Sequence, residues 1–423
     1  MRCPRFIQFS FVIYAASLAP VLGLNSCINS SANSAASSSD STSGTGSGSS
    51  ATTAYVYVAD QTASSGPNQI VAYAADANGQ LTVVTGSPFS QDVGSMAANG
   101  TNLMASANTQ PEINTYTIGS NGALTLASEF NYAPETGYRS TGCGGISGLR
   151  FDRSGQSLYG DVFNINCSSN SAIASLGVNS SNGSLSYLGN VNIGYNSSGA
   201  IAFLGNNDFA YSAFQGIYWT VLSFVRASNG NLDFNSTFTT VSPIAAPPGS
   251  TPGIVRGYTP GFTATDTTNH VAFAEFPSFT VGGAAPPVQL AAYTADANGD
   301  LSTNDTYATM PATSVRTPID LEMSPSGTLL AVGGIGGLQI FHFNGGSSVT
   351  SFTSLLTTDS IAQVAWDKSN HLYAITLTGH AYGSNSVSPG KLHVFTVTGS
   401  SATEAPGSPY TIASPVDIAV QSE

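Results

Sequence analysis

The sequence predicts an all-β fold, a seven-bladed β-propeller with four-stranded blades in which the C-terminal strand closes the first blade. Three observations lead to this prediction. Only 8% of the 423 residues are charged and 45 are glycine, a composition typical of strands and turns rather than helices. A strand–turn–strand unit recurs along the chain, and the two chain ends match neighbouring strands of that unit.

Residues 1–27 have the layout of an export signal. Arg2 and Arg5 precede a mostly apolar run that ends near Leu24, and no basic stop-transfer flank follows, which favours cleavage over retention as a membrane anchor. The residues Leu-Asn-Ser-Cys at 24–27 resemble a bacterial lipobox, so Cys27 is a candidate for lipidation. Residues 28–53 are rich in Ser, Thr and Gly and are expected to form a disordered tether, which leaves 54–423 for the propeller.

These features predict an exported protein, either a periplasmic or cell-surface lipoprotein or, without lipidation, a secreted one. Membrane contact would then occur only through the N-terminal lipid, and we expect a monomer. The formal net charge is -13, and Lys368 and Lys391 are the only lysines. No basic stripe can neutralise successive phosphates, so a nucleic acid is not an expected partner.

The repeat is clearest in "AYAADANGQL" at 72–81 and "AYTADANGDL" at 292–301. Asn-Gly also stands between two strand-like runs at 121–122, 182–183 and 229–230, and weaker copies of the unit begin at Ile340 and Val394. Asn and Gly tolerate positive φ best, so we expect two-residue type I′ hairpin turns. The spacing of oxygen-bearing residues lacks the pattern of an EF-hand, which favours a plain turn over a calcium loop.

A second hairpin precedes most of these units, with a short apolar strand, a polar turn and an aliphatic or aromatic strand. Asp152, Asp266 and Asp367 occupy the same turn position, where a short carboxylate can accept backbone N–H bonds, so we interpret them as turn-forming residues. Each period of about 40 to 70 residues then holds four strands, as propeller blades do. Radial stacking also lets a long chain fold without one oversized core.

The chain ends and two cysteines add to this prediction. The first blade starts at "TAYVYVADQ", which matches the second strand of the unit, and residues 414–423 match the missing innermost strand. Pairing between the ends would close the ring and leave no open sheet edge. Cys143 precedes the first strand of the third blade and Cys167 follows the second, so antiparallel pairing favours a disulfide over two free thiols.

The units resemble those of lactonase-type seven-bladed propellers, which include bacterial 6-phosphogluconolactonase and a muconate-cyclising relative. The matching residues are those from Tyr55 to Phe89 and, separately, the "Ser-Pro-Ser-Gly" turn at 324–327, while "GSPY" near the end is similar to "GSPF" at 86–89. The resemblance implies the fold. Enzymes of this family have a His, an Arg and an acidic residue at the channel. The corresponding early strand here, "TGCGGISGLRF", has no histidine, so no catalytic residue is transferred.

Aligned innermost strands offer one candidate site. One register holds Gly94, Gly148, Ala200, Phe262, Asp320, Gln363 and Asp417, and the position two residues later holds Met96, Arg150, Ala202, Ala264, Glu322, Ala365 and Ala419. Because strands alternate faces, both sets lie on the same face. Asp320, Glu322, Asp417 and Arg150 are the candidate catalytic residues, and Gln363 is a candidate binding residue. Water in the channel could equally satisfy these polar groups.

Two functional hypotheses remain open. One is a tethered binding or scaffold module, with a small molecule, a glycan or a protein bound at a channel mouth by long loops such as 243–261. The alternative, which the resemblance implies, is a hydrolase of sugar or other lactones, with Asp320 or Asp417 activating water and Arg150 polarising the carbonyl. A third possibility, a redox propeller that carries a quinone or haem, is disfavoured because the sequence has no Cys-x-x-Cys-His haem motif. A metal site would need more ligands than Cys143 and Cys167 offer, so we expect no cofactor and no metal.

Overall fold

The computed structural model describes residues 51–61, 68–139, 143–168, 170–194, 200–214, 220–378 and 388–422. The predicted export signal at 1–27, its candidate lipidation site Cys27 and most of the 28–53 tether lie outside these ranges. Strand β1 begins at Thr52, two residues before the expected start of the propeller. Within the described ranges, no helix combines the length and apolar character needed to cross a membrane.

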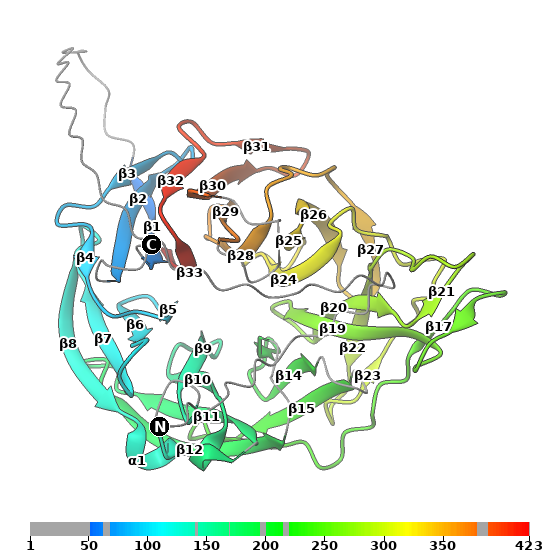
Figure 1. Ribbon diagram of the computed structural model, residues 1–423, viewed down its shortest axis with the longest axis horizontal. Helices are drawn as coiled ribbons and strands as arrows, with labels where there is room; N and C mark the ends of the chain where they lie inside the picture. The colour runs from blue at the N-terminus through cyan, green and yellow to red at the C-terminus, as the bar shows by residue number, and fades with distance from the viewer. Residues whose placement is uncertain are drawn as a thin grey trace, which may run out of the picture. The chain divides into compact units, whose positions relative to one another are not determined.

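Seven antiparallel sheets form a ring around a central axis (Figure 1). Blade 1 contains β33 (Pro415–Ser422), β1 (Thr52–Asp60), β2 (Gln69–Asp76) and β3 (Leu81–Val83), with β4 (Phe89–Ser90) also paired to β2. Blade 2 contains β5 (Ser95–Ala98), β6 (Asn102–Ser106), β7 (Glu112–Ile118) and β8 (Leu124–Asn131). Blade 3 contains β9 (Ile146–Phe151), β10 (Ser157–Val162), β11 (Ser171–Val178) and β12 (Leu185–Gly194). Blade 4 contains β13 (Ala202–Phe203), β14 (Phe209–Phe214), β15 (Thr220–Arg226) and β16 (Leu232–Phe234).

The remaining blades follow the same order from the channel outwards. Blade 5 contains β19 (Gly257–Thr265), β20 (His270–Pro277), β22 (Gln289–Ala295) and β23 (Leu301–Ser302), with β17 (Ile244–Ala245) paired to β19. Blade 6 contains β24 (Thr317–Met323), β25 (Leu329–Ile335), β26 (Gly337–Asn344) and β27 (Ser347–Ser351). Blade 7 contains β28 (Ile361–Trp366), β29 (His371–Thr376), β30 (Gly390–Val397) and β31 (Ala402–Glu404), with β32 (Tyr410–Ile412) paired to β30.

Four short elements of the described ranges lie outside this plan. The helix α1 (Ala133–Thr136) and a 3₁₀ turn at Ile165–Cys167 follow strands of blades 2 and 3. Strands β18 (Thr251–Pro252) and β21 (Phe279–Thr280) form a separate two-stranded sheet. Figure 1 shows β17 and β21 at the outer edge of the ring. Much of the 243–261 segment, expected at a channel mouth, therefore lies away from the channel.

The C-terminal strand closes blade 1, as predicted. Strand β33 pairs antiparallel with β1, with Ile418 opposite Val58 and Val420 opposite Val56. Ile418 is buried in the cluster that blades 1 and 7 share. The first and last described strands thus share one sheet, so the ring is closed by backbone hydrogen bonds.

The Asn-Gly turns differ from the prediction. The glycines have positive φ, for example 77° at Gly79 and 79° at Gly299, but none of the asparagines before them does. In the first turn, Gly79 N donates to Asp76 O and Asp76 N donates to Gln80 O, which is a three-residue loop with a left-handed glycine at its end. The type I′ prediction is therefore wrong, because this longer loop also needs positive φ, but only at the glycine.

The turn aspartates act as predicted. Asp367 Oδ1 accepts the backbone N–H groups of Ser369 and His371 at 2.9 and 2.8 Å. Asp266 and Asp152 accept backbone N–H bonds in the same way within their own turns. Each carboxylate thus holds the turn between the first and second strands of its blade.

Buried tyrosine hydroxyls join neighbouring blades. Each donates a hydrogen bond to the carbonyl of a turn glycine in the next blade. The three pairs are Tyr57–Gly122 at 2.9 Å, Tyr159–Gly230 at 2.6 Å and Tyr211–Gly299 at 2.8 Å. These three glycine turns therefore serve as contacts between blades as well as hairpin connections.

His371 forms a comparable contact between blades 7 and 1. Its Nδ1 lies 2.7 Å from Asp367 Oδ2, and the side chain is 1% exposed. Burial alone lowers the pKa of His371, but the hydrogen bond to Asp367, the charge of Asp367 and the backbone of Ala77 raise it more, so the pKa lies above the ordinary value.

Folding stability should therefore depend on pH through His371. A histidine whose folded pKa is raised stabilises the protein fully below its unfolded pKa, and this stabilisation is lost as pH rises through the folded pKa. Between those values we expect His371→Gln to remove a slope of at most about 1.4 kcal/mol per pH unit. Urea denaturation of both proteins between pH 5.5 and 9 measures this, and identical pH profiles would contradict the assigned role.

Candidate functional site in the central channel

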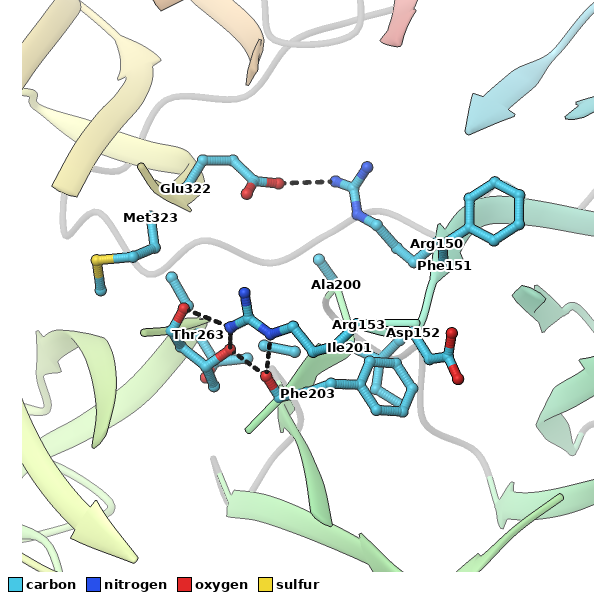
Figure 2. Close-up of a pocket in the computed structure, with 13 residues that line it drawn as sticks. Arg150, Phe151, Asp152, Arg153, Ala200, Ile201, Phe203, Thr263, Glu322 and Met323 are labelled. Carbon is cyan, nitrogen blue, oxygen red and sulfur yellow. Dashed lines mark hydrogen bonds and ion pairs between the residues drawn. The ribbon is translucent and has the colours of Figure 1, made fainter. Parts of the chain in front are cut away.

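The structure gathers the predicted site residues on the inner strands. Arg150 lies on β9, Asp320 and Glu322 on β24, Gln363 on β28 and Asp417 on β33. Arg150 Nη2 lies 3.3 Å from Glu322 Oε1, so an ion pair crosses from blade 3 to blade 6 (Figure 2). Both side chains keep partial contact with solvent, with 27% and 31% of their surfaces exposed.

Asp320, Gln363 and Asp417 make a different kind of contact. Each accepts the backbone N–H of the inner strand in the next blade. The pairs are Asp320 Oδ2 with Val364 N at 2.8 Å, Gln363 Oε1 with Ile418 N at 3.0 Å and Asp417 Oδ2 with Met96 N at 2.7 Å. These hydrogen bonds have a structural role, because they join blades 6, 7, 1 and 2 around the channel.

Ser95 is a fourth member of this series, which the sequence alignment missed. Its hydroxyl oxygen accepts a hydrogen bond from Leu149 N at 3.0 Å, and this bond joins blade 2 to blade 3. Ser95 rather than Gly94 is therefore equivalent to Asp417, and Ala97 rather than Met96 is equivalent to Arg150. The available signal was Asn99, whose Oδ1 accepts the backbone N–H groups of Thr101 and Asn102 and so takes the turn position held by aspartate in other blades.

A cavity of about 270 Å³ opens beside the ion pair. Its wall toward blades 4 and 5 includes Ala200, Ala202 and Ala264, which occupy the channel positions of those blades. Small side chains there leave a space that Arg150 and Glu322 border from the other side. The channel is therefore asymmetric, with long polar side chains on some blades and room for a ligand on the others.

Arg153 forms part of the same wall and was not predicted. Its Nε donates to Phe203 O at 2.9 Å, and its Nη2 donates to Thr265 O at 2.8 Å and Asp266 O at 2.6 Å. These contacts connect the first turn of blade 3 to blades 4 and 5 and hold the guanidinium plane in one orientation at the pocket. The turn sequence of blade 3 carries no signal for these contacts, because their partners lie in blades 4 and 5.

The charged groups in the site shift one another's pKa values. Burial raises the pKa of Glu322 to about 7, with Arg150 lowering it, Asp320 raising it and Arg153 lowering it. Burial also raises the pKa of Asp320 and of Asp417 above their usual range, although Arg150 opposes this in both cases. A carboxyl group that titrates near neutrality in a pocket is suited to general acid–base chemistry.

The carboxyl groups differ in how many of their oxygens accept hydrogen bonds from the backbone. Asp320 and Asp417 each use both oxygens on backbone N–H groups, since they also accept from Leu321 and Ile418. Glu322 pairs through Oε1 with Arg150 and faces the cavity. Glu322 is therefore the carboxylate best placed to meet a ligand. Within the described ranges, no group of three or more His, Cys, Asp or Glu side chains is arranged to hold a metal ion.

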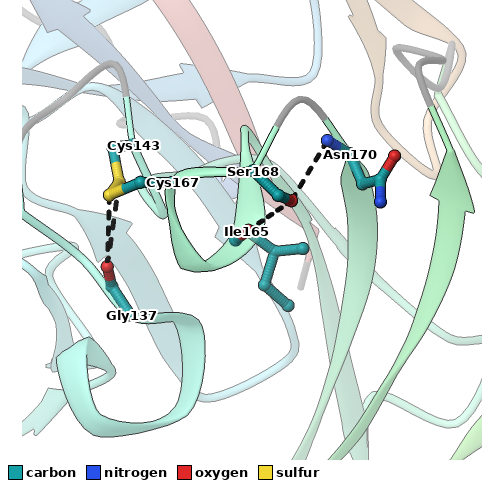
Figure 3. The surroundings of a disulfide bond; sticks show 6 residues. All are labelled: Gly137, Cys143, Ile165, Cys167, Ser168 and Asn170. Carbon is teal, nitrogen blue, oxygen red and sulfur yellow. Dashed lines mark hydrogen bonds between the residues drawn. A yellow bond between two sulfur atoms is a disulfide. The ribbon is translucent and has the colours of Figure 1, made fainter.

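The predicted disulfide is present beside blade 3. Cys143 and Cys167 are bonded, with Cα atoms 4.8 Å apart and a sequence separation of 24 (Figure 3). Both sulfur atoms lie within 4 Å of the carbonyl oxygen of Gly137, a packing contact because neither sulfur carries a proton. The disulfide joins the segment before β9 to the turn after β10. Strand β9 carries Arg150.

Loss of this disulfide should destabilise the protein. Closing a loop of this length removes unfolded-state entropy equivalent to about 3 kcal/mol, so we expect Cys143→Ser with Cys167→Ser to lower the unfolding free energy by about that amount. Urea denaturation measures the change, with reduced wild-type protein as the matched control. Equal stability of oxidised wild type and the double variant would contradict the expectation.

Comparisons with known proteins identify the fold. No family model and no curated protein matches the sequence. Among solved structures, a putative 6-phosphogluconolactonase from Bacteroides fragilis is 11% identical, with a TM-score of 0.57 over 89% of this chain and 99% of that one. The periplasmic gluconolactonase of Pseudomonas aeruginosa is 14% identical, with a TM-score of 0.57 over 87% and 98%.

A solved structure with a different described function has a similar fold. A hypothetical selenium-binding protein from Sulfolobus tokodaii is 9% identical, with a TM-score of 0.56 over 88% of this chain and 94% of that one. At such identities the likeness establishes the seven-bladed propeller fold alone. Function has to be argued from the site itself.

Proposed function

We propose that this protein hydrolyses lactones in the channel pocket, with Glu322 as the general base. The observation that carries the proposal is the Glu322–Arg150 pair at 3.3 Å, on the wall of a cavity of about 270 Å³. Two of the structural neighbours bear gluconolactonase names, which supports a sugar lactone as the first substrate class to test.

The reaction needs a base, an electrophile and an acid. Ionised Glu322 takes a proton from water as the water oxygen attacks the lactone carbonyl carbon. The guanidinium of Arg150 or Arg153 stabilises the negative charge that develops on the carbonyl oxygen. When the ring C–O bond breaks, the proton held by Glu322 passes to the departing alkoxide, so the hydroxy acid leaves and the carboxylate is restored.

Arg150 has two effects in this scheme. Its charge opposes the upward shift that burial imposes on the pKa of Glu322, which keeps that pKa at about 7. It also orients the carboxylate from across the channel. Asp320 and Asp417 support the site through their bonds to neighbouring blades and their charge, and they do not contact the substrate in this scheme.

The test uses purified full-length protein and four lactones. The panel contains glucono-δ-lactone, 6-phosphogluconolactone, an unsubstituted γ-lactone and an aryl lactone, and hydrolysis is followed by proton release in a pH-stat with the uncatalysed rate subtracted. We expect turnover of at least one sugar lactone, with kcat/KM rising as pH increases through about 7, because Glu322 must be ionised. Absence of turnover with all four lactones would overturn the proposal and favour the binding-module hypothesis instead.

The cellular location is a separate proposal. Arg2, Arg5 and the apolar run that follows support export, and the lipobox-like residues ending at Cys27 support lipidation. Expression in a bacterium with metabolic labelling by a fatty acid tests both. We expect the label in wild-type protein and its loss in Cys27→Ser, and recovery of unlabelled wild-type protein in the cytoplasm would contradict the proposal.

A further inference from the structure

Glu275 is a carboxyl group in the interior of blade 5, outside the channel pocket. It lies on β20 and is 0% exposed. Its Oε1 accepts the hydroxyl of Tyr293 at 3.0 Å. Its Oε2 is buried and has no hydrogen-bond partner among the described residues. An ionised carboxylate with an unpartnered buried oxygen would be costly, so its protonation state needs an explanation.

Gln289 lies opposite Glu275 on the neighbouring strand. The two residues are register partners in the β20–β22 pair, so their side chains leave the same face with Cβ atoms about 5 Å apart. Gln289 Nε2 donates to Met310 O at 2.8 Å and Tyr307 O at 3.2 Å. These two bonds fix the amide orientation and leave Oε1 as a second buried acceptor without a partner in the described structure.

A single proton on Glu275 Oε2 would give both this atom and Gln289 Oε1 a hydrogen-bond partner. We propose that Glu275 is a neutral carboxylic acid that donates from Oε2 to Gln289 Oε1. This bond completes a chain from Tyr293 through Glu275 and Gln289 to the backbone of Tyr307 and Met310. Glu275 therefore acts as a proton-dependent latch that connects β20 and β22 to the 303–316 segment between β23 and β24.

The electrostatic surroundings agree with this geometry. Burial raises the pKa of Glu275 to about 8, while the Tyr293 hydroxyl lowers it and the charge of Asp305 raises it. Tyr293 belongs to β22, and Asp305 lies in the 303–316 segment. Asp305 is itself held by Ala292 N and Thr309 Oγ1, which keeps a negative charge near Glu275.

The latch predicts a pH dependence of folding. A carboxyl group whose folded pKa is raised stabilises the protein fully below the unfolded pKa, and this stabilisation is lost as pH rises to the folded pKa. Between these values the folded state holds one more proton at Glu275 than the unfolded state does. The unfolding equilibrium constant should therefore rise about tenfold per pH unit from this residue alone.

Glu275→Gln is the direct test, because its amide reproduces the shape and donor of the neutral acid. We expect the variant to fold and its unfolding equilibrium constant to rise with pH less steeply than that of wild type, by about tenfold per unit between about pH 5 and 8, as measured by urea denaturation. Glu129→Gln, at an exposed position of blade 2, is the matched control and should keep the wild-type steepness. Parallel pH profiles for wild type and Glu275→Gln would overturn the proposal.

Two measurements do not depend on unfolding or on enzymatic turnover. The infrared difference between wild type and Glu275→Gln at pH 6 should contain the carbonyl band of a neutral carboxylic acid, and a carboxylate band there would overturn the proposal. Hydrogen exchange should report the 303–316 segment through Leu290 N, bonded to Pro311 O, and Thr313 N, bonded to Val288 O. Their protection should fall above pH 8 in wild type and stay constant in the variant, and a fall of equal size in both would contradict the latch.

Discussion

Replacing Glu322 by Gln should lower kcat for lactone hydrolysis by about 100-fold to 10,000-fold, the range that a general base contributes. The amide keeps the shape of the side chain and can still contact Arg150, so substrate binding should change little and KM should stay within about threefold of wild type. The rise of kcat/KM with pH through about 7 should disappear, because the group whose pKa burial raises to about 7 is gone.

The control for this experiment is Glu129→Gln, which changes an exposed glutamate on the outer strand of blade 2. It should leave both kinetic constants and the pH profile unchanged. Asp320→Asn gives a second comparison, because it disturbs the bond to Val364 N. That variant should lose stability more than intrinsic activity. Full activity of Glu322→Gln would show that another group activates water, even if lactones are the substrates.

The fold could be predicted because the same local pattern occurs many times. Each Asn-Gly turn and each turn aspartate is weak evidence alone, but a set of copies leaves few architectures that can use them all. The type I′ error shows the limit of this reasoning. The preference for Gly follows from positive φ, and a two-residue and a three-residue loop both place a glycine there, so composition does not separate them.

The candidate site was predicted in part for a similar reason. Strand alternation put Arg150 and Glu322 at equivalent positions, and the structure brings them within 3.3 Å. The alignment of blade 2 was wrong by one residue because Asn99, not Asp, forms its turn, and the shift hid Ser95. Arg153 was missed because its function comes from contacts with blades 4 and 5, which no pattern within blade 3 encodes.

The latch residues lie beyond what a sequence pattern can show. Glu275 and Gln289 are partners only because β20 and β22 pair in one register. Their unpartnered oxygens become apparent only when burial and hydrogen bonds are assigned atom by atom. A glutamate in a strand is usually exposed, so no sequence pattern marks Glu275 as a buried residue.

Removal of residues 415–423 should destabilise the ring more than any single substitution considered above. The truncation deletes β33, leaves the inner edge of β1 unpaired and exposes apolar surface that Ile418 covers. It also removes the Asp417 bond to Met96 N and the Gln421 bond to Gly100 O, which connect blade 1 to blade 2. At about 1 kcal/mol for each lost hydrogen bond and about 2 kcal/mol for the isoleucine, we expect a loss of at least about 5 kcal/mol.

A loss of that size equals the whole stability of many domains, so the truncated chain should no longer unfold in one cooperative transition. A synthetic peptide of residues 415–423 added in trans should restore the transition, because β33 contacts the rest of the ring through pairing and packing that need no covalent connection at its N-terminal end. A scrambled peptide of the same composition is the control and should not restore it. Calorimetry measures all three samples, and cooperative unfolding of the truncated chain at the wild-type temperature would show that the ring is stable without its closing strand.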